Sequence, residues 1–323
     1  MQSMLPRIEP YRRAPRLAPG DAMAVIAPSG PVPQERYLRG LTRLATRYTP
    51  RDSPGTLSRL GFLAGDDGRR LAELRWALSD PVSHAVICAR GGYGLLRLTS
   101  QLAAMASDPH ACAAAPLIGF SDITVLHALC ALRQQVSIHG PVVTQLGELA
   151  DADVQALWAL LEDPGPPPPV VDLTPLSSDR STVHGRLLGG NLELLSRLCG
   201  TPLAAALTPG EPVILLLEEV GEAPYRIDRA LTQLAVAGLL RDVVALLVGD
   251  LVRCQRPSVP HADASDPPDA LQVIAERARH IGIPAWTGMP LGHGERNRAV
   301  PLGVGVTLDG RSRQLNFHHG AVL

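Results

Sequence analysis

The sequence predicts an α/β protein of two domains, the first of them built on a parallel β-sheet. Short runs that are apolar throughout alternate with segments whose apolar residues recur at helical spacing, a pattern typical of parallel sheets covered by helices. The chain has 323 residues, enough for two domains that each bury a core. A proline-rich linker at 163–180 divides it into an N-terminal domain at 1–162 and a C-terminal domain at 181–323.

The N-terminal domain begins with alternating strands and helices. Apolar runs predict buried strands at 21–29 and 82–89, and helical spacing predicts helices at 33–47 and 68–78. The segment 48–60 is rich in Pro, Gly, Ser and Arg, so we expect an exposed loop there.

The segment 116–132 carries the strongest sign of chemistry. Apolar residues lead into Gly119, Ser121 follows, and apolar residues then recur at helical spacing, which predicts a buried strand, a tight turn and a helix. Ser121 would lie at a helix N-terminus, where free N–H groups and the helix dipole stabilise a negative oxygen. This pattern is typical of a nucleophile elbow, although from this stretch alone Ser121 could also be only an N-cap.

A glycine-rich turn, R-G-G-Y-G at 90–94, follows the strand at 82–89 and precedes a predicted helix at 95–105. Glycine lets the backbone approach a ligand closely or adopt positive φ. Ligands of parallel sheets lie beyond the carboxyl ends of the strands, and both this turn and Ser121 lie at such ends.

The C-terminal domain repeats the alternation. The apolar strand at 212–217 is followed directly by Glu218, and His293 lies among small residues in 290–300. The other predicted elements are a strand end, glycine turn and helix at 184–198, a helix at 225–240, a strand at 243–248, a helix at 271–280 and a hairpin at 304–317.

Composition excludes several classes of function. The chain contains no lysine, so a P-loop lysine, a Schiff-base lysine and a Ser-Lys dyad are impossible. The formal net charge is −1, which argues against a nucleic-acid partner. No H-E-x-x-H is present, and we predict neither a metal nor a cofactor.

The cysteines indicate a reducing compartment. The five cysteines are widely spaced and form no C-x-x-C pair, so we expect buried thiols rather than disulfides or a zinc site. We see no signal peptide and no apolar run of about 18 residues, so we expect a cytoplasmic protein without a membrane partner.

Ser121, Glu218 and His293 are polar residues where the sequence otherwise has apolar residues or glycine. A serine hydroxyl needs a base, a neutral imidazole suits that role near pH 7, and a carboxylate fixes the imidazole tautomer. Taken singly, each has an ordinary alternative. Glu218 could pair with an arginine, and His293 could be a hydrogen-bonded loop histidine.

Six motifs in order resemble the LD-carboxypeptidase family of serine peptidases, which includes the microcin C immunity proteins. The resemblance covers nearly the whole chain. The motifs are A-V-I-C-A-R-G-G-Y-G (85–94), L-I-G-F-S-D-I-T (117–124), S-I-H-G-P (137–141), G-R-L-L-G-G-N-L (185–192), L-L-L-E-E-V-G-E-A-P-Y-R-I-D-R (215–229) and L-G-H-G-E-R-N (291–297).

The resemblance implies a role for each member of the site. Ser121 would be the nucleophile, His293 the general base and acid, and Glu218 the carboxylate that orients it. The oxyanion hole would use the N–H of Asp122 with one from Gly91 or Gly92. Arg90 is the candidate for binding a substrate carboxylate.

The resemblance also implies the fold and the cleft. A flavodoxin-like or Rossmann-like N-terminal domain would carry the serine, and a swivelling-type α/β C-terminal domain would carry the acid and the histidine. Ile123 stands at the last glycine of G-x-S-x-G. The chain departs from the family at Glu219, where the family usually has aspartate, and in the short, irregular stretch before Gly61.

The implied reaction is removal of a C-terminal D-amino acid from a murein tetrapeptide during peptidoglycan recycling, and the family suggests a homodimer. A second hypothesis is an amidase that detoxifies peptidyl- or aminoacyl-nucleotide antibiotics. It needs an aromatic residue for base stacking, and Trp286 lies just upstream of His293. A third is a two-domain small-molecule binder without catalysis.

Overall fold

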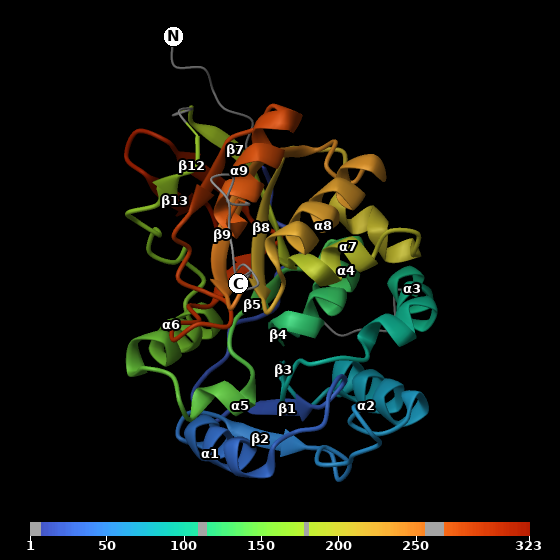
Figure 1. The fold of residues 1–323 in the computed structure, drawn as a ribbon. Helices are drawn as coiled ribbons and strands as arrows, with labels where there is room; N and C mark the ends of the chain where they lie inside the picture. Colours follow the sequence, from blue (N-terminus) through green and yellow to red (C-terminus); the bar gives the residue numbers. More distant parts are fainter. Residues whose placement is uncertain (1–7, 109–114, 178–180, 256–267) are drawn as a thin grey trace.

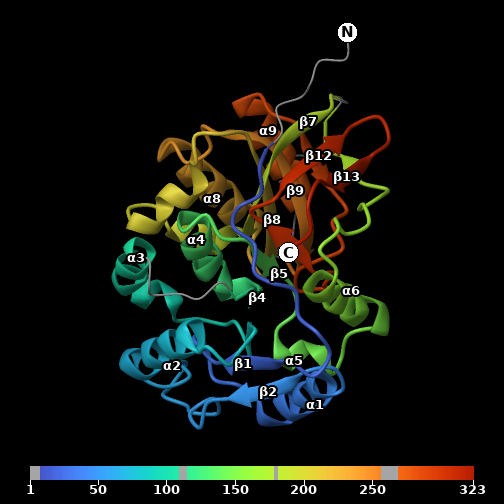
Figure 2. The same ribbon diagram turned by 180° about the vertical axis from the view of Figure 1, so that it is seen from behind.

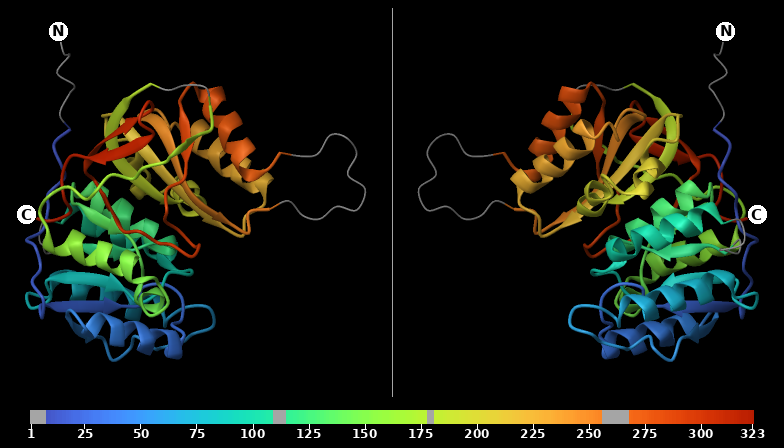
Figure 3. Two further views of the ribbon diagram at one scale, coloured as in Figure 1. Left: turned by 90° about the vertical axis from the view of Figure 1, so that its left-hand side faces the viewer. Right: turned by 90° about the vertical axis from the view of Figure 1, so that its right-hand side faces the viewer.

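Two β-sheets with helices packed against them form the two lobes of the protein (Figure 1, Figure 2 and Figure 3). The computed structural model describes residues 8–108, 115–177, 181–255 and 268–323. The lower lobe in Figure 1 contains the N-terminal helices and strands, and the upper lobe contains most of the chain after residue 180. This arrangement confirms the predicted α/β fold class.

The first sheet has six strands in the order β11-β5-β4-β3-β1-β2. Its first five strands in the chain run parallel to their neighbours, whereas β11 is antiparallel to β5. The central strands are uniformly apolar because helices cover both faces of such a sheet. The strands are β1 (Ala22–Ile26), β2 (Thr49–Asp52), β3 (Ala85–Cys88), β4 (Leu117–Gly119), β5 (Ser137–His139) and β11 (Val300–Leu302).

The helices of this lobe follow its strands as predicted. Those expected at 33–47, 68–78 and 95–105 are present with slightly different ends. They are α1 (Gln34–Ala45), α2 (Asp67–Ser79), the 3-10 turn η1 (Leu95–Leu98) with α3 (Thr99–Ser107), the 3-10 turn η2 (Ser121–Ile123) with α4 (Thr124–Leu132), α5 (Val143–Leu146) and α6 (Asp151–Glu162).

The second sheet has seven strands in the order β13-β12-β7-β8-β9-β10-β6, and β7 to β10 are parallel. Its strands are β6 (Thr174–Pro175), β7 (Val183–Asn191), β8 (Val213–Val220), β9 (Val243–Val252), β10 (Ala285–Thr287), β12 (Gly305–Asp309) and β13 (Gln314–Phe317). Its helices are α7 (Leu192–Arg197), the 3-10 turn η3 (Pro202–Leu207), α8 (Pro224–Val236) and α9 (Ala270–Ile281).

The prediction of an exposed loop at 48–60 is wrong in part, because β2 lies within it. The strand T-P-R-D pairs only with β1, at the edge of the sheet. An edge strand tolerates polar residues and a proline such as Pro50, since one side of its backbone has no partner. The strand propensities of these residues therefore did not predict β2.

The proline-rich segment contains no helix between 164 and 177, but it is bound to the second sheet. β6 pairs with β10, and an isolated bridge joins Val170 to Leu315. Residues 178–180 of the predicted linker lie outside the described residues. The connection between the lobes is therefore partly fixed by hydrogen bonds to one of them.

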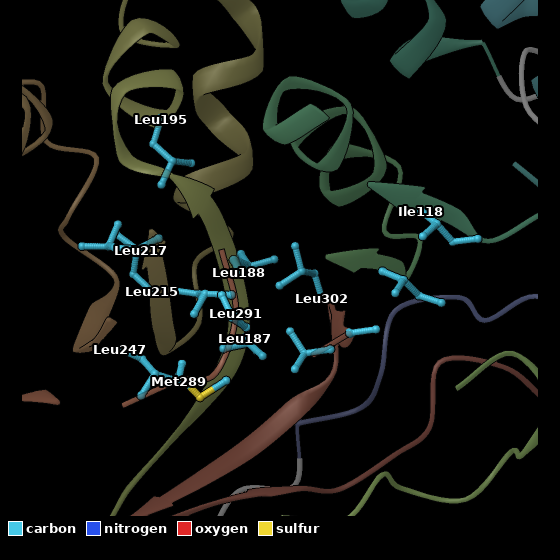
Figure 4. Packing of buried hydrophobic residues seen from close by; sticks show 14 of the residues in the cluster. Ile118, Leu187, Leu188, Leu195, Leu215, Leu217, Leu247, Met289, Leu291 and Leu302 are labelled. Atoms are coloured by element: carbon cyan, nitrogen blue, oxygen red, sulfur yellow. The ribbon is translucent and has the colours of Figure 1, made fainter. Parts of the chain in front are cut away.

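The chain returns to the first lobe near its end, through β11. The apolar core is continuous across both sheets, and it includes Ile118 of β4, Leu187 and Leu188 of β7, and Leu302 of β11. Figure 4 shows these residues together with Leu291, which precedes the glycine before His293. Burial of this shared core opposes separation of the lobes.

Two further features were tested by the structure. Cys88, Cys130 and Cys254 are buried and Cys199 is half-buried, all as free thiols, and Cys112 lies outside the described residues. Across the part of the chain that the structure describes, we find no helix with the length and hydropathy needed to cross a bilayer.

A buried hydrogen bond joins the lobes beside α4, which contacts both α3 and α7. The N–H of Asn191, at the end of β7, donates to Oγ1 of Thr124, the first residue of α4, over 2.9 Å. The approach is close, because a Cβ added to Gly190 would lie 2.5 Å from Oγ1 of Thr124. The helix that follows Ser121 is therefore fixed to the C-terminal lobe.

We predict that Thr124→Val lowers the free energy of unfolding by about 1–3 kcal/mol, because the buried N–H of Asn191 loses its acceptor. Denaturant unfolding measures this change. Thr42→Val is the control, since the Thr42 hydroxyl bonds only to the Leu38 carbonyl on an exposed face of α1. Equal stability losses in the two variants would contradict the prediction.

Candidate active site

Ser121 lies in a sharp turn between β4 and α4. Its φ is +66°, a left-handed conformation that is uncommon for a residue with a side chain. The regular helix begins at Thr124, one 3-10 turn later than the predicted helix start. A Cβ on Gly119 would lie 2.9 Å from the side chain of Ile123, so the missing side chain of Gly119 leaves the space that Ile123 fills.

The glycine-rich turn after β3 lies directly against this elbow. A Cβ on Gly91 would be 2.9 Å from Cβ and 3.1 Å from Oγ of Ser121, so only glycine fits without displacement. The Gly91 carbonyl accepts a hydrogen bond from Gly30 N–H, and Gly92 has a φ of +110°. Among the described residues, no protein acceptor takes the N–H groups of Gly91, Gly92 or Asp122.

The side chain of Asp122 connects the turn to the elbow, a contact that the sequence analysis missed. It is buried, and its Oδ2 accepts a hydrogen bond from Leu95 N–H over 3.0 Å. Burial raises the pKa of Asp122 above its usual range, against the hydrogen bonds that it accepts. The carboxylate therefore holds the helix after the glycine turn next to Ser121.

Glu218 and His293 contact each other although 75 positions separate them. His293 Nδ1 lies 2.7 Å from Oε2 of Glu218, which is completely buried near the end of β8. Gly292 makes this contact possible, since a Cβ there would lie 3.3 Å from Cβ of Glu218 at a φ of +128°. The alternative reading of Glu218, a pair with an arginine, does not occur among the described residues.

The His293 ring reaches the elbow of the other lobe. Its centroid lies 4.8 Å from that of Phe120, the residue before Ser121. Behind Phe120, His139 and His127 are fully buried, with centroids 6.0 Å apart. Burial lowers the pKa of His127 to about 4 and lowers that of His139 as well, so both are neutral. His293, partly exposed, is the imidazole of this group that solvent can reach.

Two further side chains hold the loop of His293: Asp250, which lies in none of the motifs, and Asn297, which ends the motif at 291–297 but had no predicted role. Oδ2 of Asp250, on β9, accepts from Gly294 N–H over 2.9 Å. Oδ1 of Asn297 accepts from Gly292 N–H over 3.2 Å. The first bond fixes the peptide that follows His293, and the second fixes the peptide between Leu291 and Gly292.

Arg90 has a structural contact of its own. Its Nη1 donates to the carbonyl of Pro31, and it belongs to no ion pair in the described part of the chain. Tyr225 is exposed, whereas Arg226 pairs with Glu222 and Asp228 pairs with Arg277. Contact of Arg90 with substrate remains a prediction.

Glu219 links β8 to the start of α7. Its carboxylate accepts from the Asn191 side chain over 3.0 Å and from the N–H groups of Glu193 and Val220 over 2.8 Å each. Burial is the main reason that the pKa of Glu219 rises to about 7, and neighbouring Glu218 adds to the rise. The residue that departs from the family pattern thus has a structural place beside Glu218.

Comparison with known proteins identifies relatives along nearly the whole chain. Residues 23–140 match the LD-carboxypeptidase N-terminal domain, and residues 184–308 match the C-terminal domain. A Streptomyces coelicolor protein provisionally named a carboxypeptidase is 38% identical over 321 residues, covering 96% of this chain and 97% of the relative. The murein tetrapeptide carboxypeptidase of Pseudomonas aeruginosa is 35% identical over 269 residues, covering 78% and 81%.

Solved structures have the same fold. Muramoyltetrapeptide carboxypeptidase from Oxalobacter formigenes superposes with a TM-score of 0.75 at 27% identity, covering 93% of this chain and 99% of that one. The microcin C7 self-immunity protein in complex with aspartyl sulfamoyl adenosine gives a TM-score of 0.80 at 19% identity, covering 97% and 100%. The second likeness concerns the fold alone.

We predict that Glu219 makes the protein less stable as the pH rises from about 4.5 to 7. The folded state keeps the proton up to a pKa of about 7, whereas the unfolded chain releases it near 4.5. The folded state therefore binds more protons in this window, and the free energy of unfolding falls by up to about 3 kcal/mol across it. Glu219→Gln should remove this fall, measured by denaturant unfolding at several pH values.

The comparison between wild type and variant uses the dependence of the free energy of unfolding on pH. The absolute stability is not compared, because the glutamine side chain has one acceptor oxygen fewer than the glutamate. Glu162→Gln is the control: Arg47 lowers the pKa of Glu162, so its effect lies below pH 4.5. An unchanged slope in Glu219→Gln would contradict the prediction.

Proposed function

Because the chain belongs to the LD-carboxypeptidase family, we propose that it is a serine carboxypeptidase that releases a C-terminal D-amino acid from a murein tetrapeptide. The bond cleaved is the amide between an L-configured centre and the terminal D-residue. The observation that carries the proposal is the 2.7 Å contact of Glu218 with His293, whose ring packs beside the Ser121 elbow. The names of the relatives support the choice of substrate.

In the proposed first half-reaction, Oγ of Ser121 attacks the carbonyl carbon of the scissile amide. Nε2 of His293 accepts the hydroxyl proton, and Glu218 stabilises the imidazolium through the Nδ1 hydrogen bond. N–H groups of Asp122 and of Gly91 or Gly92 bind the oxyanion, which is why their lack of protein acceptors supports this role.

His293 then gives its proton to the leaving nitrogen, and the C–N bond breaks. The D-amino acid departs and leaves an ester between Ser121 and the shortened peptide. Water attacks this ester with His293 again acting as base, the second tetrahedral intermediate expels Oγ, and the tripeptide product leaves. Each proton taken from a nucleophile is returned to a leaving group, so the enzyme ends unchanged.

The substrate carboxylate and the cellular context extend the proposal. Arg90 can still offer donors to a terminal carboxylate, because its bond to Pro31 occupies one of the five N–H groups of a guanidinium. A role in recycling murein peptides places the enzyme in the cytoplasm, and the family suggests a homodimer. Neither a metal nor a cofactor takes part in the steps above.

The alternative substrate is a peptidyl- or aminoacyl-nucleotide, favoured by the fold shared with the microcin C7 self-immunity protein. Trp286, which the sequence offered for stacking on a base, is completely buried in β10 and cannot do so. An exposed aromatic such as Tyr225 would have to replace it. The murein peptide is therefore the better supported substrate.

We predict that the purified protein releases D-alanine from murein tetrapeptide and that Ser121→Ala lowers this release by at least about 1,000-fold, because the acyl-enzyme can no longer form. Chromatography of the peptide products measures the rate. Thr99→Ala, a hydroxyl deletion at the start of α3, is the control.

Release by Ser121→Ala at the wild-type rate would reject the acyl-enzyme mechanism. No release by the wild type, combined with hydrolysis of an aminoacyl sulfamoyl nucleoside, would move the enzyme to the alternative substrate. Failure with both substrates and no fluorophosphonate labelling of Ser121 would favour the non-catalytic binder.

We predict that Gly91→Ala lowers kcat at least about tenfold, because its methyl group must displace Ser121 or the neighbouring N–H groups. Steady-state kinetics and thermal unfolding together separate this effect from loss of fold. Gly68→Ala, in the first turn of α2, is the matched control. Wild-type kcat in a folded Gly91→Ala protein would remove the glycine turn from the mechanism.

A further inference from the structure

The loop that carries His293 has no regular secondary structure of its own. It begins after β10 of the second sheet and ends at β11 of the first, so it crosses between the lobes. Backbone hydrogen bonds hold its first part, where Asp250 N–H donates to the Leu291 carbonyl and Arg298 N–H donates to the Pro290 carbonyl, each over 2.9 Å. Between residues 292 and 297 the described residues form no such backbone bond, so side chains must fix this stretch if the ring is to keep one position.

The C-terminal lobe supplies two of these fixed points. Glu218 bonds to the imidazole, and Asp250 accepts from Gly294 N–H. Both acids lie on neighbouring parallel strands of the same sheet. These contacts set the position of His293 relative to its own lobe, but they do not fix it relative to Ser121.

Asn297 supplies a connection to the N-terminal lobe. Its side chain is fully buried, its Oδ1 accepts from Gly292 N–H over 3.2 Å, and its Nδ2 donates to Oε1 of Gln145 in α5 over 3.0 Å. Thr144, the residue before Gln145, donates its N–H to the carbonyl of Ala89 over 3.0 Å. Ala89 is two residues before Gly91.

We propose that Asn297 is a positioning residue that, through Gln145, fixes His293 relative to Ser121 and the glycine turn. The inference rests on the proposed function. An amide suits this position because it accepts one hydrogen bond and donates another from a single short side chain. Alanine removes both bonds and leaves Gly292 N–H without its acceptor.

Two other side chains of the same loop bind different parts of the protein. Arg296 pairs with buried Asp153 in α6 over 2.7 Å, and Arg298 donates to the carbonyls of Pro168 and Pro169. Neither bonds to a peptide next to His293. Arg298→Ala is therefore a matched control that loosens the loop without touching the path to the glycine turn.

The experiment compares Asn297→Ala, Gln145→Leu, the double variant, Gln145→Glu and Arg298→Ala in the full chain. The readouts are the rate of Ser121 labelling by a fluorophosphonate, kcat and KM for D-alanine release, and the midpoint of thermal unfolding. We expect the first two variants each to lower labelling and kcat by roughly 10- to 100-fold with KM changed less than about threefold.

The double variant should be no slower than Asn297→Ala, because both changes break one path. Gln145→Glu should stay within about threefold of the wild type, since a carboxylate still accepts the amide N–H of Asn297. Arg298→Ala should keep the wild-type labelling rate. If Asn297→Ala fails to fold, Gln145→Leu decides, because Gln145 is only partly buried.

Wild-type labelling and kcat in folded Asn297→Ala or Gln145→Leu would overturn the inference, as would equal losses in Arg298→Ala. These results leave the proposed function intact. A wild-type protein that neither labels nor releases D-alanine would overturn the proposed function, and the inference with it. A wild type that labels without releasing D-alanine changes only the substrate, and the labelling rates then decide the role of Asn297.

Discussion

The hydrogen bond between Glu218 and His293 is the interaction on which the site depends. Glu218 is completely buried, and its other oxygen, Oε1, accepts no hydrogen bond from the described residues. A buried carboxylate is costly unless it is paired, so the Nδ1–H of His293 compensates for the burial. The same bond selects the tautomer whose Nε2 has a free lone pair. The proton position that stabilises buried Glu218 is therefore also the one that the proposed general base requires.

The proposed mechanism also needs Ser121, on the other lobe, at a constant distance from this pair. Two sets of bonds join the lobes around the site: Asn191 to Thr124 on one side, and Asn297 to Gln145 on the other. The first fixes the helix that follows Ser121, and the second fixes the loop of the histidine. Because both sets are buried or nearly so, the geometry depends on packed polar contacts more than on the proline-rich connection between the lobes.

The sequence predicted the elements whose signals are local. Uninterrupted apolar runs gave β1 and β3, and the change from strand to helical spacing located the turn at Ser121. It did not predict β2, which is polar because it is an edge strand, or β11, which has three residues and pairs with a strand over 160 positions away. The chemistry of the side chains could suggest an acid and a histidine. Their contact could not be predicted, because it depends on the end of β8 lying next to the loop between β10 and β11 in the folded protein. Asp250 lies in none of the motifs, and Asn297 ends the motif at 291–297 without a predicted role, because the function of each is set by what it contacts.

The left-handed conformation of Ser121 shows why the elbow needs such supports. A non-glycine residue at a φ of +66° costs on the order of 1–3 kcal/mol and persists only when its surroundings determine it. Here the buried Asp122 carboxylate binds the residue after the glycine turn, and Ile123 packs into the space beside Gly119. Phe120 and Asp122, the two residues that flank Ser121, are both buried, while Ser121 itself is only partly buried. The strain is therefore the cost of leaving Ser121 partly exposed between two buried neighbours, Phe120 and Asp122.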